Sequence, residues 1–473
     1  MGKKNLDNNS LDNNSLDKKN INKKKKEIDL TTGVLWKQIL VFSIPLMMSN
    51  LLQVLFNICD IAVVGKFAGS YALGSVGSTT TLVTLLTGIL IGIAGAINVL
   101  TALSIGLKSP RDIEETVHSA AIISLIAGLG LLVGGLCFSR MILELLHTKE
   151  ELIDGAASYL RIYCLGMPAL ALYNFGNAVF SAAGNTRKPL VYLIIAGIVN
   201  ALLNLFLVIV CHLSVYGVAI ASIVSQYLSA FLIIRDLHHT EELYRLNPAK
   251  LKLSDRMTRQ ILRLGIPAAL QSTIFCVANL FVQTGVNSFN ATIVAGNAAA
   301  ANADNLIYDI MAAFYTACAS FMGQNIGAKK EERVRKSYFL SVFYSFAIAL
   351  LLGGLLVLFG RQFLSLFTSE EDVVMAGMER LTIMGMSYCV SSFMDCTIAA
   401  SRALGKTFVP TVMVILGSCV FRVAWIFTIF ALYRTTTSLY LLYVFSWSIT
   451  AVAEILYFRR AYRQTPGLAR AEV

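Results

Sequence analysis

The sequence predicts an all-α polytopic membrane protein whose twelve transmembrane helices form two six-helix repeats. The chain of 473 residues is 56% hydrophobic and 14% charged, with a mean hydropathy of +0.67, whereas soluble domains carry about 25% charged residues. Apolar runs long enough to cross a bilayer recur along the whole chain, and patterns in the first half return in the second half. This composition excludes a soluble enzyme.

The first 35 residues differ in composition from the rest of the chain. They contain the repeat LDNNS-LDNNS-LDKKN, followed by a run of lysines at residues 23–26. Such a polar, low-complexity segment cannot bury a core, so we expect a disordered cytoplasmic tail. No apolar stretch precedes Trp36, so we do not expect a signal peptide.

Twelve apolar spans follow this tail. About 20 helical residues cross the hydrocarbon core of a bilayer, and the two longest spans are expected to tilt or to extend beyond it. The predicted spans are residues 38–65, 72–106, 117–138, 159–183, 189–211, 215–234, 260–285, 292–326, 337–359, 380–404, 409–431 and 438–458.

Basic residues are concentrated in alternate loops. The loops after the second, fourth, sixth, eighth and tenth spans carry lysine and arginine, as does the segment after the twelfth. The other loops contain few basic residues and most of the acidic ones. The positive-inside rule therefore predicts that both termini are cytoplasmic. The net charge of +11 is explained by membrane insertion, and we expect no nucleic-acid partner.

The two halves of the chain repeat one another. KQILVFSIP at residues 37–45 returns as RQILRLGIP, an offset of 222, and AAGNTRKP at residues 182–189 returns as ALGKTFVP, an offset of 221. A six-helix unit ends on the side of the membrane where it began, so the two units are parallel repeats with a cavity at their interface. The expected organisation is a tail (1–35), an N-lobe (36–234), a cytoplasmic linker (235–258), a C-lobe (259–460) and a cytoplasmic tail (461–473).

Cysteine and histidine give no sign of a metal site. The nine cysteines lie in or beside apolar runs and form no close CxxC pair, so we expect small buried hydrophobic residues rather than disulfides or metal ligands. The five histidines fall at helix ends or in loops. We expect no cofactor, and no metal site other than one for a coupling ion.

The first span carries a polar stripe that ends in a carboxylate. Asn50, Gln53, Asn57 and Asp60 follow one another at steps of three, four and three residues, so they share one helix face. A carboxylate at membrane depth is costly and usually marks an ion or substrate path. The alternative is a structural carboxylate held by hydrogen bonds to neighbouring helices.

Other predicted spans also contain polar residues. Asn200 and Asn204 are four residues apart in the fifth span, and together with Asp60 they favour a site for a small cation or a proton. Asp395 and Arg422 lie at depths that allow a buried ion pair, with a structural role. Polar pairs can also be seams between helices. The residues expected to line a substrate cavity are Gln53, Asn174, Asn177, Asp304, Tyr308 and Asp395.

Several motifs, taken together and in order, carry a family resemblance. They are FSIPLMMSNLLQVLFNICDIAVVGKFAG at residues 42–69, ALGSVG from Ala72, the Asn200 and Asn204 pair, YGVAIASIVSQ at 216–226, GQNIGAKKEERVRKS at 323–337 and SRALGKT at 401–407. Across residues 36–460 the chain resembles the bacterial MATE family, the multidrug and toxic compound extrusion transporters.

The resemblance implies a V-shaped antiporter of two lobes. Asp60 matches the coupling aspartate of the family, Pro45 matches the proline where the first helix bends, and Asn200 matches the fifth-helix asparagine. Asn204 stands where many relatives have aspartate, so the resemblance implies one carboxylate in place of two. The segment after Pro267 lacks the glutamate of some Na⁺-coupled members, so the resemblance implies no Na⁺ site in the second half of the chain.

We therefore expect a monomeric antiporter in the bacterial inner membrane. It would export amphipathic, cationic drugs or toxic metabolites in exchange for H⁺ or Na⁺, with Asp60, Asn57, Asn200 and Asn204 coupling the ion. The alternative is a flippase for a lipid-linked saccharide, which requires a strongly basic cavity. A membrane-embedded enzyme is not expected, because no pair of a histidine and an acid lies within the spans.

Overall fold

The computed structural model describes residues 28–146 and 148–465, and within these residues the chain forms helices and connecting turns. The predictions for the tails at 1–27 and 466–473 lie outside the described residues. The helices of the first half are α2 (Leu35–Val63), α3 (Gly69–Gly106), α4 (Pro110–Leu145), α5 (Glu150–Cys164), α6 (Met167–Ala182), α7 (Arg187–Leu205) and α8 (Ser214–His239), and π-helical turns extend α2 and α7 over Val64–Ala68 and Phe206–Val210.

The second half follows the same plan. A single 3₁₀ turn, Pro248–Lys250, interrupts the linker before it. Its long helices are α9 (Asp255–Val286), α10 (Ala291–Gly327), α11 (Glu331–Leu364), α12 (Glu371–Ala403) and α16 (Thr436–Gln464). A further helix with two π-helical stretches lies between α12 and α16. It consists of α13 (Phe408–Val414), Ile415–Val420, α14 (Phe421–Trp425), Ile426–Phe430 and α15 (Ala431–Tyr433).

Eleven of the twelve predicted spans are helices long and apolar enough to cross a membrane, counted over the described residues. The fourth prediction, 159–183, is corrected by the structure. It is divided between α5 and α6, which meet at a turn at Leu165 and Gly166. Pro168 lies in the first turn of α6, where its missing N–H is tolerated, whereas inside a helix it would remove a hydrogen bond.

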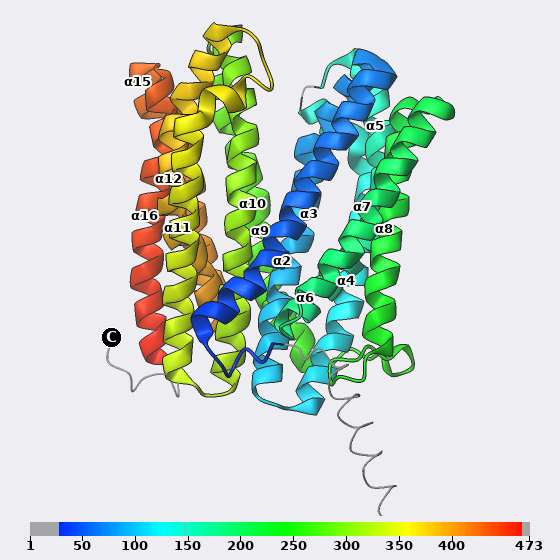
Figure 1. The fold of residues 1–473 in the computed structure, drawn as a ribbon, viewed down its shortest axis with the longest axis vertical. Coiled ribbons are helices and arrows are strands. Elements are labelled where there is room, and N and C mark those ends of the chain that lie inside the picture. Colours follow the sequence, from blue (N-terminus) through cyan, green and yellow to red (C-terminus); the bar gives the residue numbers. More distant parts are fainter. Residues whose placement is uncertain (1–27, 147, 466–473) are drawn as a thin grey trace, which may run out of the picture.

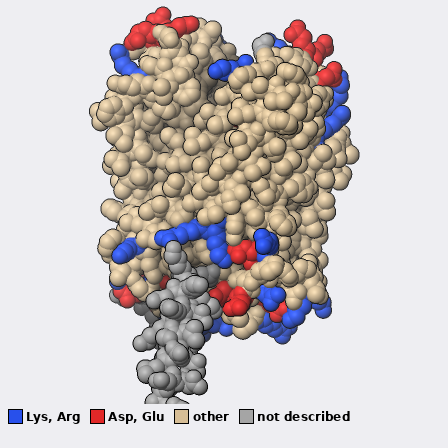
Figure 2. All heavy atoms as spheres, turned by 45° about the vertical axis from the view of Figure 1, so that its right-hand side comes forward, with Lys and Arg blue, Asp and Glu red and all other residues tan. Residues whose placement is uncertain are grey.

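The helices gather in two bundles, α2–α8 and α9–α16, which diverge towards one end (Figure 1). We call this the acidic end, because its turns carry Glu150, Glu370 and Glu371. Figure 2 shows acidic side chains on the two tips of this end with a hollow between them. At the opposite, basic end the turns carry Lys108, Lys329 and other cations, and the bundles meet.

The first helix of each bundle packs against the other bundle near the basic end. The lower half of α2, with Ile39 and Phe42, shares a buried cluster with Phe314 and Phe321 of α10, and Figure 1 shows α2 crossing from one bundle to the other. In the second half Ile261 of α9 joins the cluster of α3 and α4 in the same way. The bundles therefore interlock at the basic end.

Glycines bring α3 and α10 into backbone contact at this end. A Cβ atom on Gly106 would overlap the carbonyl oxygen of Gln324, and one on Gly327 would overlap that of Leu103. Small residues at such crossings let membrane helices approach closely. Nearby, Ser320 of α10 donates a hydrogen bond to Oδ1 of Asn98 on α3 at 3.1 Å.

The contact between α3 and α10 predicts the effect of adding one methyl group. Gly106→Ala should lower the stability of the protein by about 2 kcal/mol, because the added carbon has only backbone to displace. The midpoint of thermal unfolding in detergent measures this change. Gly95→Ala is the matched control on the same helix, since no atom lies within 4 Å of its added Cβ. Equal midpoints for the two variants would contradict the close contact.

Candidate functional site

The upper half of α2 leaves α10 and packs on α7 within its own bundle. Gly197 of α7 permits this approach, because any side chain there would overlap the ring of Phe56. One helical turn further along α2 lies Asp60, half-buried and opposite α7 and α8. The close contact at Gly197 thus sets the position of the carboxylate.

Two asparagines and two serines surround Asp60. Asn204 donates from Nδ2 to Oδ1 of Asp60 and to Oδ1 of Asn200, the latter at 3.2 Å. Ser222 of α8 donates from Oγ to Oδ2 of Asp60 at 3.4 Å. Asn200 donates from Nδ2 to Oγ of Ser225 at 3.5 Å. The structure therefore brings together three of the four residues predicted for ion coupling, Asp60, Asn200 and Asn204.

This site consists of oxygen acceptors in a place shielded from solvent. Asn200, Asn204, Ser222 and Ser225 are all buried. Oδ1 of Asn204 has no hydrogen-bond partner among the described residues. A carboxylate, amide oxygens and hydroxyls are the ligands that a hard cation prefers, and the carboxylate can also bind a proton. The donor set fits a small cation or a proton.

Both helices that carry the site change their winding beside it. The π-helical turn after α2 begins at Val64, four residues after Asp60, and the one after α7 begins at Phe206, two residues after Asn204. Single π-turns of this kind are frequent at functional sites. Pro45 lies in the buried lower half of α2, and its carbonyl oxygen accepts a hydrogen bond from Ser49 at 3.0 Å.

Four other predicted residues lie apart from the hydrogen bonds of Asp60. The side chains of Asn57 and Gln53 are exposed on α2. Asn174 of α6 donates to the carbonyl oxygen of Leu170 in its own helix at 2.9 Å, and Asn177 is half-buried. Asn57 shares a helix face with Asp60 but does not bond to it.

The structure corrects the assignment of Asp304 to an open cavity. Asp304 forms a buried ion pair with Arg380 of α12, and Arg380 also donates to Oδ1 of Asn297 at 2.6 Å. The ring of Tyr440 lies 5.4 Å from the guanidinium carbon. A carboxylate and a guanidinium enclosed in this way neutralise one another, so the pair ties α10 to α12.

The predicted ion pair between Asp395 and Arg422 is not formed within 4 Å. Arg422 instead donates to Oδ1 of Asn279 at 2.9 Å and to Ser446 at 3.3 Å. The rings of Phe275 and Tyr443 lie 4.6 and 4.5 Å from its guanidinium carbon. Because its cation is stabilised by amide and aromatic groups, Arg422 is held away from the carboxylate.

Asp395 belongs to a different group of buried polar residues. Oδ2 of Asp395 and both carboxylate oxygens of Glu454 are buried without a hydrogen-bond partner among the described residues. Arg402 interacts electrostatically with both carboxylates and donates to Gln271 at 3.1 Å. Tyr308, 45% exposed, lies edge-on to Tyr315 beside this group.

Sequence reasoning did not assign Ser222, Ser225 or Arg380. Ser222 and Ser225 lie in the stretch YGVAIASIVSQ, and their spacing of three residues puts them on one helix face. The predicted span 380–404 begins at Arg380, but α12 begins nine residues earlier at Glu371. The arginine is therefore inside the helix and needs a counter-ion there.

Comparison with known proteins supports a transporter fold. The MatE family model matches residues 45–206 and again residues 267–428, in agreement with the sequence repeat. The probable multidrug resistance protein YpnP of Bacillus subtilis is 30% identical over 77% of this chain and 81% of its own. A protein of Shewanella oneidensis described as an FAD transporter is 23% identical over 73% and 77%.

Solved structures of low sequence identity share the fold. A multidrug resistance MATE family transporter in an outward-facing conformation superposes with a TM-score of 0.86 at 20% identity, over 94% of this chain and 99% of its own. A MOP superfamily transporter of Pyrococcus furiosus gives 0.85 at 21% identity, over 94% and 100%. The two matches of the family model and the identity to YpnP show that this chain belongs to the MatE family of multidrug efflux transporters.

Proposed function

We propose that the protein is a secondary antiporter that exports amphipathic, cationic compounds in exchange for H⁺ or Na⁺. The observation that carries this proposal is the position of Asp60, a carboxylate at membrane depth bonded to Asn204 and Ser222. Such a group can take up a cation on one side of the membrane and release it on the other. The family membership supports export of small molecules rather than catalysis.

The proposed location is the bacterial inner membrane, with the basic end in the cytoplasm. Cations in the turns of that end favour cytoplasmic placement, and α2 begins and α16 ends there (Figure 1). YpnP and the FAD transporter named above come from bacteria. The hollow at the acidic end then opens to the outside. No cofactor is needed, and a monomer suffices because both repeats are in one chain.

Transport proceeds by alternating access between the two bundles. An ion from outside neutralises Asp60, and the hydrogen bonds from Asn204 and Ser222 rearrange. The first helix then shifts near Pro45, and the cargo is released outside as the outer hollow closes. The ion leaves towards the cytoplasm when the bundles rock back. A cationic cargo that approaches Asp60 competes with the coupling ion for the same negative charge.

The flippase alternative receives less support. A pyrophosphate group needs accessible cations, whereas Arg422 is 1% exposed and covered by Phe275, Tyr443 and Trp447. Arg380 is neutralised by Asp304. In the upper half of α2, the exposed polar side chains are the uncharged Gln53 and Asn57.

Asp60→Asn should fold and lose ion-driven export. The amide is nearly isosteric with the carboxylate but cannot bind a proton, and it binds Na⁺ poorly, so efflux should fall below about a tenth of the unsubstituted rate. Efflux of a fluorescent cationic dye from energised vesicles measures this, with a pH gradient alone and then a Na⁺ gradient alone. The effective gradient identifies the ion.

Asp154→Asn is the control for this experiment. Asp154 pairs with Arg140 on the exposed acidic end, so its loss should leave efflux unchanged. Full efflux by the Asp60→Asn variant under either gradient would refute the role of Asp60.

Asn204→Asp should retain export and bind the coupling ion more tightly. A second carboxylate beside Asp60 cannot stay ionised at low cost, so a proton or Na⁺ is drawn to the pair. The ion concentration for half-maximal efflux should fall about ten-fold. The matched variant Asn204→Ala, which removes the hydrogen bond without adding charge, should not show this fall. Equal values for the two variants would contradict the proposed ion site.

A further inference from the structure

We propose that two clamps at the basic end hold the outward-open arrangement, and that both must release before the basic end can open. One is a strap, residues 28–34, which precedes α2. The other is the end of the linker, residues 247–256, which leads into α9. The proposal rests on the alternating access argued above, and it assigns contacts that hold one of the two states.

The strap is bound by side chains of the second bundle. Arg333 of α11 donates to the carbonyl oxygens of Gly33 at 2.8 Å and of Leu30 and Thr32 at 3.1 Å each. Lys330 donates to the carbonyl oxygen of Thr31 at 2.6 Å. Cationic donors to neutral carbonyls form strong hydrogen bonds. One arginine therefore binds the carbonyl oxygens of three strap residues.

The strap also contacts both bundles through packing. Leu30 is fully buried and shares a cluster with Phe42 and Phe321. Asn325 of α10 donates to its carbonyl oxygen at 3.1 Å. Gly184, in the turn between α6 and α7 with φ of +87°, lies so close that a Cβ there would overlap the carbonyl oxygen of Ile28. The strap therefore lies between a turn of the first bundle and a turn of the second.

Asp29 adds a negative charge to the strap. Burial opposes its ionisation, but hydrogen bonds from the side chain and amide of Thr31, together with the charge of Lys330, outweigh burial and lower its pKa. The carboxylate is therefore ionised at neutral pH. Its charge also attracts Arg333, which strengthens the hold of the second bundle on this segment.

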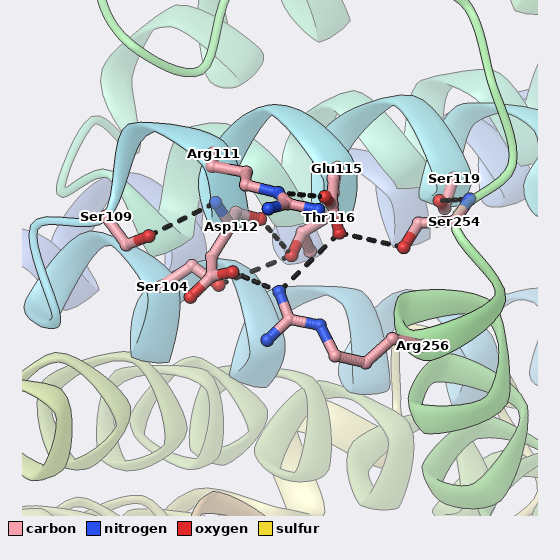
Figure 3. A network of polar contacts seen from close by, with 9 residues as sticks. All are labelled: Ser104, Ser109, Arg111, Asp112, Glu115, Thr116, Ser119, Ser254 and Arg256. Carbon is pink, nitrogen blue, oxygen red and sulfur yellow. Dashed lines mark hydrogen bonds and ion pairs between the residues drawn. The ribbon is translucent and has the colours of Figure 1, made fainter.

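The linker is bound by α4 of the first bundle (Figure 3). Arg256 pairs with Asp112 and lies 3.5 Å from Oε2 of Glu115. Ser254 donates from Oγ to Glu115 at 2.8 Å, and its amide donates to Oγ of Ser119 at 3.0 Å. The network joins the two bundles, because α4 belongs to the first bundle and α9 is the first helix of the second bundle.

Further up the linker, the amide of Asn247 donates to Nε2 of His118 at 3.1 Å. Lys250 lies 3.7 Å from Glu114. These two contacts add to the network of Figure 3, so the linker is bound to α4 over the length from Asp112 to Ser119.

The two clamps occupy equivalent places in the repeats. The offset of 222 that aligns Lys37 with Arg259 places the strap opposite the end of the linker. The offset of 221 that aligns Gly106 with Gly327 places Asp112 opposite Arg333. At this position one repeat carries an acid that binds an arginine, and the other carries an arginine that binds carbonyl oxygens.

Opening of the basic end must break these contacts. The strap touches Gly184 on one side and Arg333 on the other, so separation of the two turns breaks one set of contacts even if α2 bends at Pro45. The linker clamp joins α4 to the start of α9, and opening breaks it when α9 moves as a whole with the second bundle. Weakening either clamp should therefore increase the population that is open at the basic end.

The distance between spin labels across the basic end tests this inference. Cysteines replacing Arg187, at the start of α7, and Lys406, in the turn after α12, are labelled in a full-length variant whose nine native cysteines are replaced. Both positions are exposed and belong to different bundles. Without substitution we expect one short distance in lipid nanodiscs. Arg256→Ala should raise the ratio of the population at the longer distance to the population at the shorter distance about five-fold, as for loss of a partly exposed ion pair. Arg333→Ala should raise it more, about ten-fold or above.

Controls separate clamp release from unfolding. Arg259→Ala removes an exposed arginine one turn along α9 from Arg256, and it should leave the distances unchanged. The exchange of charges in Asp112→Arg with Arg256→Asp should restore the short distance. Unchanged distances in folded Arg256→Ala and Arg333→Ala variants would overturn the inference, as would a failed restoration.

The measurement uses no ion gradient and no cargo. Its failure is therefore distinguishable from failure of the proposed antiport, which the Asp60→Asn efflux experiment tests.

Discussion

The backbone contact between α3 and α10 is the constraint on which the rest of the architecture depends. Gly106 and Gly327 allow two long helices from different bundles to touch at the basic end. Lipid supplies no hydrophobic force between helices, so close packing and hydrogen bonds must hold them together. With α3 and α10 in contact, the first helix of each bundle can cross onto the other, and in this arrangement the bundles separate towards the acidic end.

The two repeats share one fold but differ in the polar residues that they carry. Pro45 has a counterpart at Pro267, but the position equivalent to Asp60 is Val282, which is buried in an apolar cluster. The second bundle instead contains the pair Asp304–Arg380 and a group around Asp395. Uncompensated charges at membrane depth are costly. The first half stabilises Asp60 with hydrogen bonds from Asn204 and Ser222, whereas the second half pairs Asp304 with Arg380. The repeats share a fold because packing can be symmetric while charge compensation is local.

The helix α2 connects the elements that the proposed mechanism needs. Its start follows the strap, its lower half packs on α10, Pro45 interrupts its hydrogen bonding, and its upper half carries Asp60 to Asn204. A change of charge at Asp60 and release of the strap therefore act on opposite ends of one helix. This arrangement gives a physical route by which an ion bound near one face can influence closure at the other.

Hydropathy, loop charge and the internal repeat predicted the membrane fold, its two halves and the stripe ending in Asp60, because lipid solvent imposes helical segments of fixed length. The pairing of Asn200 with Asn204 was also visible, since four residues make one helical turn. The break at Leu165, the pair Asp304–Arg380 and the bond from Ser222 to Asp60 were not. Asp60 and Ser222 are 162 residues apart, and contacts over such separations depend on how helices cross, which only the packed tertiary structure decides.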